Sequence, residues 1–98
     1  MSFRHISLLQ WKGGTADAMV DAVVSDLRAL PAQIPELRHY VVGTDARIND
    51  GNYDLAVVAD FDDEAGYLVY RDHPAHRKVL EERIRPIVAS RAAVQHAF

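Results

Sequence analysis

Tyrosine and histidine side chains that can handle a proton are grouped between Tyr67 and His76, where the sequence reads Tyr-Leu-Val-Tyr-Arg-Asp-His-Pro-Ala-His. A neutral histidine accepts a proton near physiological pH, because its unperturbed pKa is about 6.5. A tyrosine hydroxyl donates a hydrogen bond to a carbonyl oxygen that gains charge when the neighbouring carbon loses its proton. We therefore predict that Tyr70 and His76 are catalytic, with His76 as the base and Tyr70 as the oxyanion donor.

Pro74 decides whether these two side chains can meet. Proline has no amide hydrogen and disfavours helical backbone at the residue before it, so one helix should end near Asp72 and another should begin at Pro74. His76 then shares the inward face of the second helix with Leu80, near a positive helix end that favours the neutral imidazole. In one uninterrupted helix Tyr70 and His76 would diverge by roughly 120°, but a break at Pro74 lets them converge.

A structural role for the same side chains stays open, because partly buried tyrosines and histidines often only hydrogen-bond the backbone at a helix junction. His73, held extended before Pro74, is expected to fix that junction. His73 and His76 with Asp72 offer ligands for a metal ion, but no third strong ligand follows at a recognised spacing. We therefore predict no metal site and no cofactor, while a weak magnesium site on carboxylates stays open.

The residues opposite this pair should come from a strand over residues 3–12, whose side chains alternate between two faces. The odd-numbered face holds His5, Ser7 and Leu9, and we expect these three to line a pocket in which the small Ser7 leaves space. Tyr67 and Leu80 should complete the lining on the helical side, although Tyr67 also suits the core. The predicted site holds a small hydrophobic or aromatic ligand between sheet and helices.

The remaining elements follow from hydrophobic periodicity and from residues that start or stop helices. Three helices are expected: one from a Thr15 cap to Pro31, one from Asp62 or Asp63 to Asp72, and one from Pro74 to Pro86. Three further strands are expected over residues 37–43, 54–61 and 90–98. The turn residues Asn49 to Asn52 should pair the second and third strands antiparallel. The order β-α-β-β-α-α-β predicts an α+β fold, with a ferredoxin-like antiparallel four-stranded sheet and helices on one face.

A single domain over residues 1–98 would leave the other face of this sheet without cover. Ile6 and Leu8 lie on the even-numbered face of the first strand and would form an exposed apolar patch. A homodimer that packs sheet against sheet covers the patch, and two-fold symmetry is the commonest arrangement. We therefore predict a dimeric α/β barrel.

The composition argues against several other functions. A formal net charge of -3 gives no basic surface for nucleic acid, and the chain has no cysteine for disulfides, thiolate metal sites or a cysteine nucleophile. No apolar run has membrane-spanning length, and the first residues lack a signal-peptide pattern. We therefore expect a cytoplasmic protein with neither nucleic acid nor a membrane as a partner.

Two stretches together resemble the stress-responsive α/β-barrel domain family. In residues 3–12 a histidine precedes alternating hydrophobic residues and a Trp-Lys pair, and residues 70–76 read Tyr-x-x-His-Pro-x-His. The resemblance implies ferredoxin-like protomers in a dimeric barrel. In the plant polyketide cyclases of this family, which close a linear polyketide thioester by aldol condensation, Tyr70 and His76 would match the catalytic pair and His5 a pocket residue. Ser7 replaces a bulkier apolar residue of those cyclases, so the same substrate is not implied.

Three hypotheses about function follow. The first is a cofactor-free enzyme with polyketide cyclase-like chemistry on a small hydrophobic carbonyl compound. The second is a non-catalytic, stress-associated dimer that binds a ligand or has a structural role. The third is a cofactor-free monooxygenase on a related barrel. A cavity beside Tyr70 and His76, on the odd-numbered face of the first strand, would favour a site over solid packing.

Overall fold

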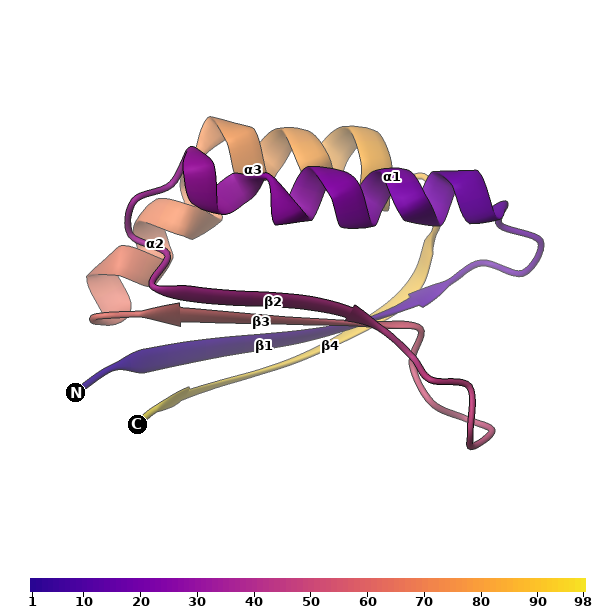
Figure 1. The fold of residues 1–98 in the computed structure, drawn as a ribbon, viewed down its shortest axis with the longest axis horizontal. Coiled ribbons are helices and arrows are strands. Elements are labelled where there is room, and N and C mark those ends of the chain that lie inside the picture. Colours follow the sequence, from indigo (N-terminus) through magenta and orange to yellow (C-terminus); the bar gives the residue numbers. More distant parts are fainter.

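Four antiparallel strands form one sheet, and the helices cover one of its faces in the computed structural model, which describes residues 1–98 (Figure 1). The elements are β1 (Phe3–Trp11), α1 (Asp17–Arg28), the 3-10 turn η1 (Leu30–Ala32), β2 (His39–Thr44), β3 (Leu55–Phe61), α2 (Glu64–Asp72), α3 (Pro74–Val79), the π-helical turn η2 (Leu80–Ile84) and β4 (Val88–Ala97). The strand order is β2-β3-β1-β4. The predicted ferredoxin-like fold is therefore confirmed. Every helix is too short or too polar to span a lipid bilayer.

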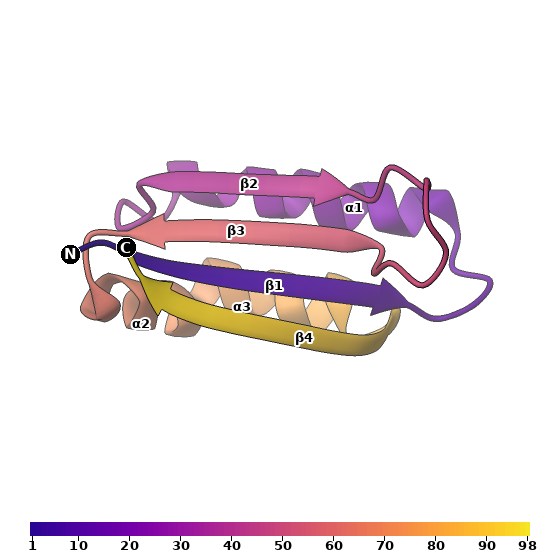
Figure 2. The ribbon, with the colours of Figure 1, turned by 90° about the horizontal axis from the view of Figure 1, so that it is seen from below.

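The hydrophobic core lies between the sheet and the helices. Val23, Leu27 and Leu30, from α1 and the turn after it, are almost fully buried in one cluster with Leu55 and Phe61 of β3. Burying a side chain of this size contributes roughly 1.5–3 kcal/mol. β1 runs between β3 and β4, with α1 behind β2 and β3 and with α3 behind β1 and β4 (Figure 2). The odd-numbered residues of β1 therefore face the helices from the middle of the layer.

The break between α2 and α3 forms where Pro74 predicts it. His73 between the two helices is extended, with φ -62° and ψ 134°, and Pro74 is the first residue of α3. The Ala75 amide donates a hydrogen bond to His73 Nδ1 at 3.1 Å, so His73 fixes the junction as predicted. Asp63 caps α2 by accepting from the Gly66 amide at 2.9 Å. Both helix starts next to the candidate site are therefore held by their own side chains.

One helix-start prediction is wrong. Thr15 does not cap α1, because Ala16 occupies the N-cap position without a side-chain hydrogen bond. The Thr15 hydroxyl instead donates to the Lys12 carbonyl oxygen at 2.6 Å. This bond closes the turn at Gly14, which needs glycine because its φ is 80°. α1 also ends earlier than predicted, and Pro31 lies in the 3-10 turn η1 that follows it.

The sheet face away from the helices is bare (Figure 2). The strand register aligns Val41, Val58, Ile6 and Val94 in one row across all four strands. Val41 is 45% exposed and Val94 61% exposed. The apolar face predicted from Ile6 is therefore present, and it extends from one edge of the sheet to the other.

Candidate functional site

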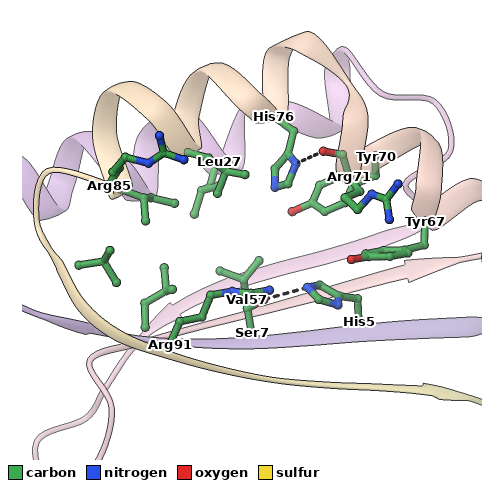
Figure 3. Close-up of a pocket in the computed structure, with 14 residues that line it drawn as sticks. His5, Ser7, Leu27, Val57, Tyr67, Tyr70, Arg71, His76, Arg85 and Arg91 are labelled. Carbon is green, nitrogen blue, oxygen red and sulfur yellow. Dashed lines mark hydrogen bonds between the residues drawn. The ribbon is translucent and has the colours of Figure 1, made fainter.

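A cavity of about 430 Å³ lies between the inner face of the sheet and the helical layer (Figure 3). All seven residues predicted for the site line it: His5, Ser7, Leu9, Tyr67, Tyr70, His76 and Leu80. Seven further residues that the sequence did not single out complete the lining: Leu27, Val57, Arg71, Ile84, Arg85, Val88 and Arg91. The cavity that would favour a site over solid packing is therefore present.

Tyr70 and His76 meet at this cavity, as the break at Pro74 allows. Their rings stack with centroids 4.1 Å apart and planes inclined by 28°. Tyr70 is 3% exposed and His76 is 9% exposed. The Tyr70 ring also packs on Phe61 of β3, with centroids 5.4 Å apart. The predicted convergence of the two side chains is confirmed.

The protonation of His76 follows from its hydrogen bond. Its Nδ1 lies 3.2 Å from the carbonyl oxygen of Arg71, and a carbonyl oxygen can only accept, so Nδ1 carries the hydrogen. Nε2 is then unprotonated, and the ring reaches from the helical layer into the cavity (Figure 3). Burial lowers the pKa of His76, although its backbone hydrogen bonds oppose the shift. His76 is therefore a neutral imidazole whose free nitrogen can accept a proton.

Tyr40 is a further residue of the site that sequence reasoning missed. Its hydroxyl on β2 lies 3.0 Å from the hydroxyl of Tyr70. Burial raises the pKa of Tyr70 to about 12, and the hydrogen bond from Tyr40 opposes this rise. Burial raises the pKa of Tyr40 as well, so both hydroxyls keep their protons and either can donate in this bond. With Tyr40 as the donor, the Tyr70 hydrogen is left for a ligand.

His5 forms part of the cavity wall with both ring nitrogens engaged. The Gln95 side-chain amide donates to His5 Nδ1 at 2.9 Å, so the ring hydrogen is on Nε2 and is donated to the Ser7 hydroxyl, also at 2.9 Å. Burial, helped by the positive charge of Arg91, lowers the pKa of His5 to about 4. The ring packs on Tyr67 with centroids 4.8 Å apart. His5 therefore stays neutral at pH 7 and suits a lining role, as predicted, rather than that of a base.

The charged residues that line the cavity are all arginines, namely Arg71, Arg85 and Arg91. No group of three or more histidine, aspartate or glutamate side chains in the chain is placed to hold a metal ion. Tyr70 and His76 can supply proton transfer and hydrogen bonding at the cavity, next to these positive charges.

Residues 3–96 match the family model of the stress responsive A/B barrel domain. The chain belongs to this family. No curated protein has a significantly similar sequence. Among solved structures, a dimeric ferredoxin-like protein of unknown function from Thermobifida fusca is 47% identical, with a TM-score of 0.92 over 100% of this chain and 92% of that one. The family and the fold expected from residues 3–12 and 70–76 are therefore both confirmed.

More distant structures share the fold of this stress-responsive A/B barrel protein. A protein of the same family, which is also called Dabb, from Mesorhizobium loti is 20% identical, with a TM-score of 0.82 over 99% of this chain and 96% of that one. The hydroxynitrile lyase from Passiflora edulis is 19% identical, with a TM-score of 0.86 over 99% of this chain and 93% of that one. At this level of identity the likeness concerns the fold alone.

In this stress-responsive A/B barrel protein, the position of Tyr40 depends on the strand register. Tyr40 lies opposite Ala59 of β3, and Ala59 lies opposite His5 of β1, so one row of the sheet carries both side chains. Only this register brings Tyr40 to the site. Period-two alternation from Val42, which is buried, would have placed Tyr40 on the inner face, but not beside Tyr70.

Proposed function

We propose that this stress-responsive A/B barrel protein is a cofactor-free enzyme that removes a proton beside a carbonyl group of a small hydrophobic compound, as in enolisation or polyketide cyclase-like aldol closure. The hydrogen bond of His76 supports this most directly. Nδ1–H is held by the Arg71 carbonyl oxygen at 3.2 Å, which leaves the unprotonated Nε2 for the cavity beside Tyr70. A neutral base and a hydrogen-bond donor for the oxyanion are the minimum set for this chemistry.

In the proposed reaction the C–H bond beside the carbonyl breaks, and its proton moves to His76 Nε2. The electron pair left behind forms the enolate, whose oxygen accepts a hydrogen bond from the Tyr70 hydroxyl, while Tyr40 donates to Tyr70. The enolate carbon then attacks a second carbonyl carbon of the same molecule. The new alkoxide takes the proton back from the imidazolium, so His76 returns to its neutral form and no co-reactant is needed.

Proton exchange tests this proposal before the physiological substrate is known. In deuterium oxide, benzylacetone exchanges its α-protons for deuterium each time an enolate forms, and NMR follows the exchange. We expect the protein to accelerate exchange, and His76→Ala to reduce the acceleration by about 10²- to 10⁴-fold, the usual contribution of a general base. His73→Ala is the matched control, because His73 caps α3 and does not line the cavity. Equal acceleration by the wild type and His76→Ala, or none by either, would contradict the proposal.

A non-catalytic, ligand-binding dimer is the second candidate, and one observation favours it. Every fully buried side-chain nitrogen and oxygen has a hydrogen-bond partner, which is also what a rigid binding pocket needs. Thermal-shift measurements with aromatic acids and β-polyketide analogues separate the two candidates. Ligand stabilisation of the wild type without α-proton exchange in any bound ketone would support the binding protein.

We also propose that two protomers pack through the bare sheet face into a dimeric barrel. The row centred on Ile6, with the exposed Val41 and Val94 at its ends, supports this interface. Beside the row, Arg4 Nε pairs with Asp60 Oδ1 at 2.7 Å, so this charged pair enters the interface already satisfied. The 47% identical protein from Thermobifida fusca is described as dimeric, which supports the same assembly for this chain.

A further inference from the structure

The cavity combines an apolar lining with an unbalanced positive charge. Three arginines line it, whereas no aspartate or glutamate does. The whole chain carries a formal net charge of -3, so the positive cavity runs against the charge of the molecule. Positive charge beside apolar walls favours a ligand that has both an apolar body and an anionic group.

Two of the three arginines already have an acidic partner. Arg71 Nε pairs with Asp72 Oδ1 at 2.9 Å, and Arg85 Nη1 pairs with Glu81 Oε2 at 2.6 Å. Arg91 forms no ion pair, and its guanidinium has no hydrogen-bond partner in the protein. Arg91 is therefore the arginine whose positive charge is left for a ligand.

β4 directs Arg91 toward the cavity. The strand register sets Arg91 opposite Leu9, which places both residues on the inner face of the sheet. In Figure 3 the Arg91 side chain runs from β4 along the floor of the cavity toward Ser7 and Val57. The residue is also exposed to solvent, so it borders the mouth of the cavity that it lines.

The charge of Arg91 reaches the two residues proposed to be catalytic. Burial raises the pKa of Tyr70 to about 12, and Arg91 opposes that rise. Burial lowers the pKa of His76, and Arg91 lowers it further. An anion on Arg91 would therefore lie in the same cavity as Tyr70 and His76, with the apolar side chains of Leu27 and Val57 also lining that space.

We propose that the ligand of this cavity carries a carboxylate, which Arg91 binds at the mouth while the ligand carbonyl faces Tyr70 and His76. The substrate class is then a keto acid with an apolar body. A guanidinium presents two parallel N–H donors that fit the two oxygens of a carboxylate. A carboxylate brings one negative charge for the one unpaired arginine, whereas a phosphate would bring a second charge with no partner. The placement of the ligand carbonyl beside Tyr70 and His76 rests on the proposed function. The contact between the carboxylate and Arg91 is tested by binding alone.

Two ligands that differ only in charge test the contact. β-Benzoylpropionate has a ketone, a phenyl ring and a carboxylate, and β-benzoylpropionamide replaces the carboxylate with a neutral amide. By isothermal titration calorimetry at low salt, we expect the wild type to bind the acid about tenfold more tightly than the amide, as for one charge-assisted contact. Arg91→Gln should lose this preference by weakening the acid and leaving the amide unchanged. Arg83→Gln is the matched control and should retain the preference, because Arg83 is paired with Asp26 and does not line the cavity.

A phosphonate analogue of the acid separates the two anion types. Binding of the phosphonate more tightly than the acid would overturn the carboxylate assignment. Equal binding of acid and amide, binding of neither, or a preference that survives in Arg91→Gln would overturn the contact with Arg91. Measurements of α-proton exchange distinguish failure of the carboxylate proposal from failure of the proposed function. If Arg91→Gln loses the preference for the acid while no bound ketone exchanges its α-protons, the carboxylate site stands and the enzyme proposal fails. If the protein accelerates α-proton exchange but binds the acid and the amide equally well, the enzyme proposal stands and the carboxylate site fails.

Discussion

Replacing Tyr40 with phenylalanine tests whether the second tyrosine supports the first. The substitution removes one hydroxyl and leaves the ring, so the Tyr70 hydroxyl loses the partner that lies 3.0 Å away. A neutral hydrogen bond is worth about 0.5–1.5 kcal/mol, and about 1.4 kcal/mol corresponds to a tenfold change in rate. If Tyr40 donates to Tyr70 while Tyr70 stabilises the enolate, Tyr40→Phe should lower kcat about two- to tenfold and leave KM unchanged. Tyr70→Phe removes the oxyanion donor itself and should cost about 10²- to 10³-fold.

The α-proton exchange of a bound ketone, followed by NMR over a range of ketone concentrations, gives kcat and KM for both variants. Tyr40→Phe also removes a partly buried hydrogen bond, so the unfolding temperature of the variant has to be measured and the kinetics recorded well below it. An unchanged kcat would show that Tyr40 has no part in the reaction. A change confined to KM would mean that Tyr40 affects ligand binding only. A loss as large as that of Tyr70→Phe would contradict a merely supporting role for Tyr40.

Two more predictions concern pH and assembly. Because burial lowers the pKa of His76, kcat/KM should be constant at neutral pH and should fall only on acidification, with a midpoint below about 6.5. A midpoint at or above this value, which is that of free histidine, would contradict a buried base. Stability should fall over the same acid range, since His5, with a pKa of about 4, and His76 both take up protons more readily in the unfolded chain; folding therefore has to be monitored at each pH. Val94→Arg should convert a dimer into a monomer by light scattering, because it puts a charge on the proposed interface. Met19→Arg, at a similarly exposed apolar residue of α1, should leave the dimer intact, and equal behaviour of the two variants would mean that the interface lies elsewhere.

The convergence of Tyr70 and His76 could be predicted from the sequence because its cause is local. Proline restricts its own backbone and that of the preceding residue, so the break at His73 does not depend on the rest of the fold. The inner face of β1 could be predicted for a similar reason, since strand alternation needs only neighbouring residues. These two local rules were enough to predict part of the lining of the cavity between the sheet and the helices.

Tyr40 and Arg91 could not be placed in the same way, because their positions depend on the strand register. Tyr40 reaches Tyr70 only through the pairing of β2 with β3, and the sequence contains no signal that sets it beside one particular helix residue. Arg91 on an edge strand looks like the charged residues that commonly protect sheet edges from further pairing. Its significance appears only when its neighbours are known, because what marks Arg91 is the lack of an acidic partner. The prediction that Thr15 caps α1 was wrong for a different reason. A threonine hydroxyl can form either a helix cap or a turn, and the local sequence does not distinguish between the two.

The π-helical turn η2 explains how one run of helix supplies both His76 and the lining residues that follow it on the helical side of the cavity. In an ideal α-helix, residues five apart point about 140° away from each other, so Leu80 and Arg85 would face different directions. The structure instead closes a wider turn there, in which the Arg85 amide donates to the Leu80 carbonyl oxygen at 2.9 Å. Leu80, Ile84 and Arg85 consequently all line the cavity, on the helix that begins with His76 in its first turn. Turns of this kind are frequent at functional sites, where one extra residue redirects a side chain. The break at Pro74 and the π-helical turn η2 thus act together: the first brings His76 to Tyr70, and the second keeps the following residues on the cavity side.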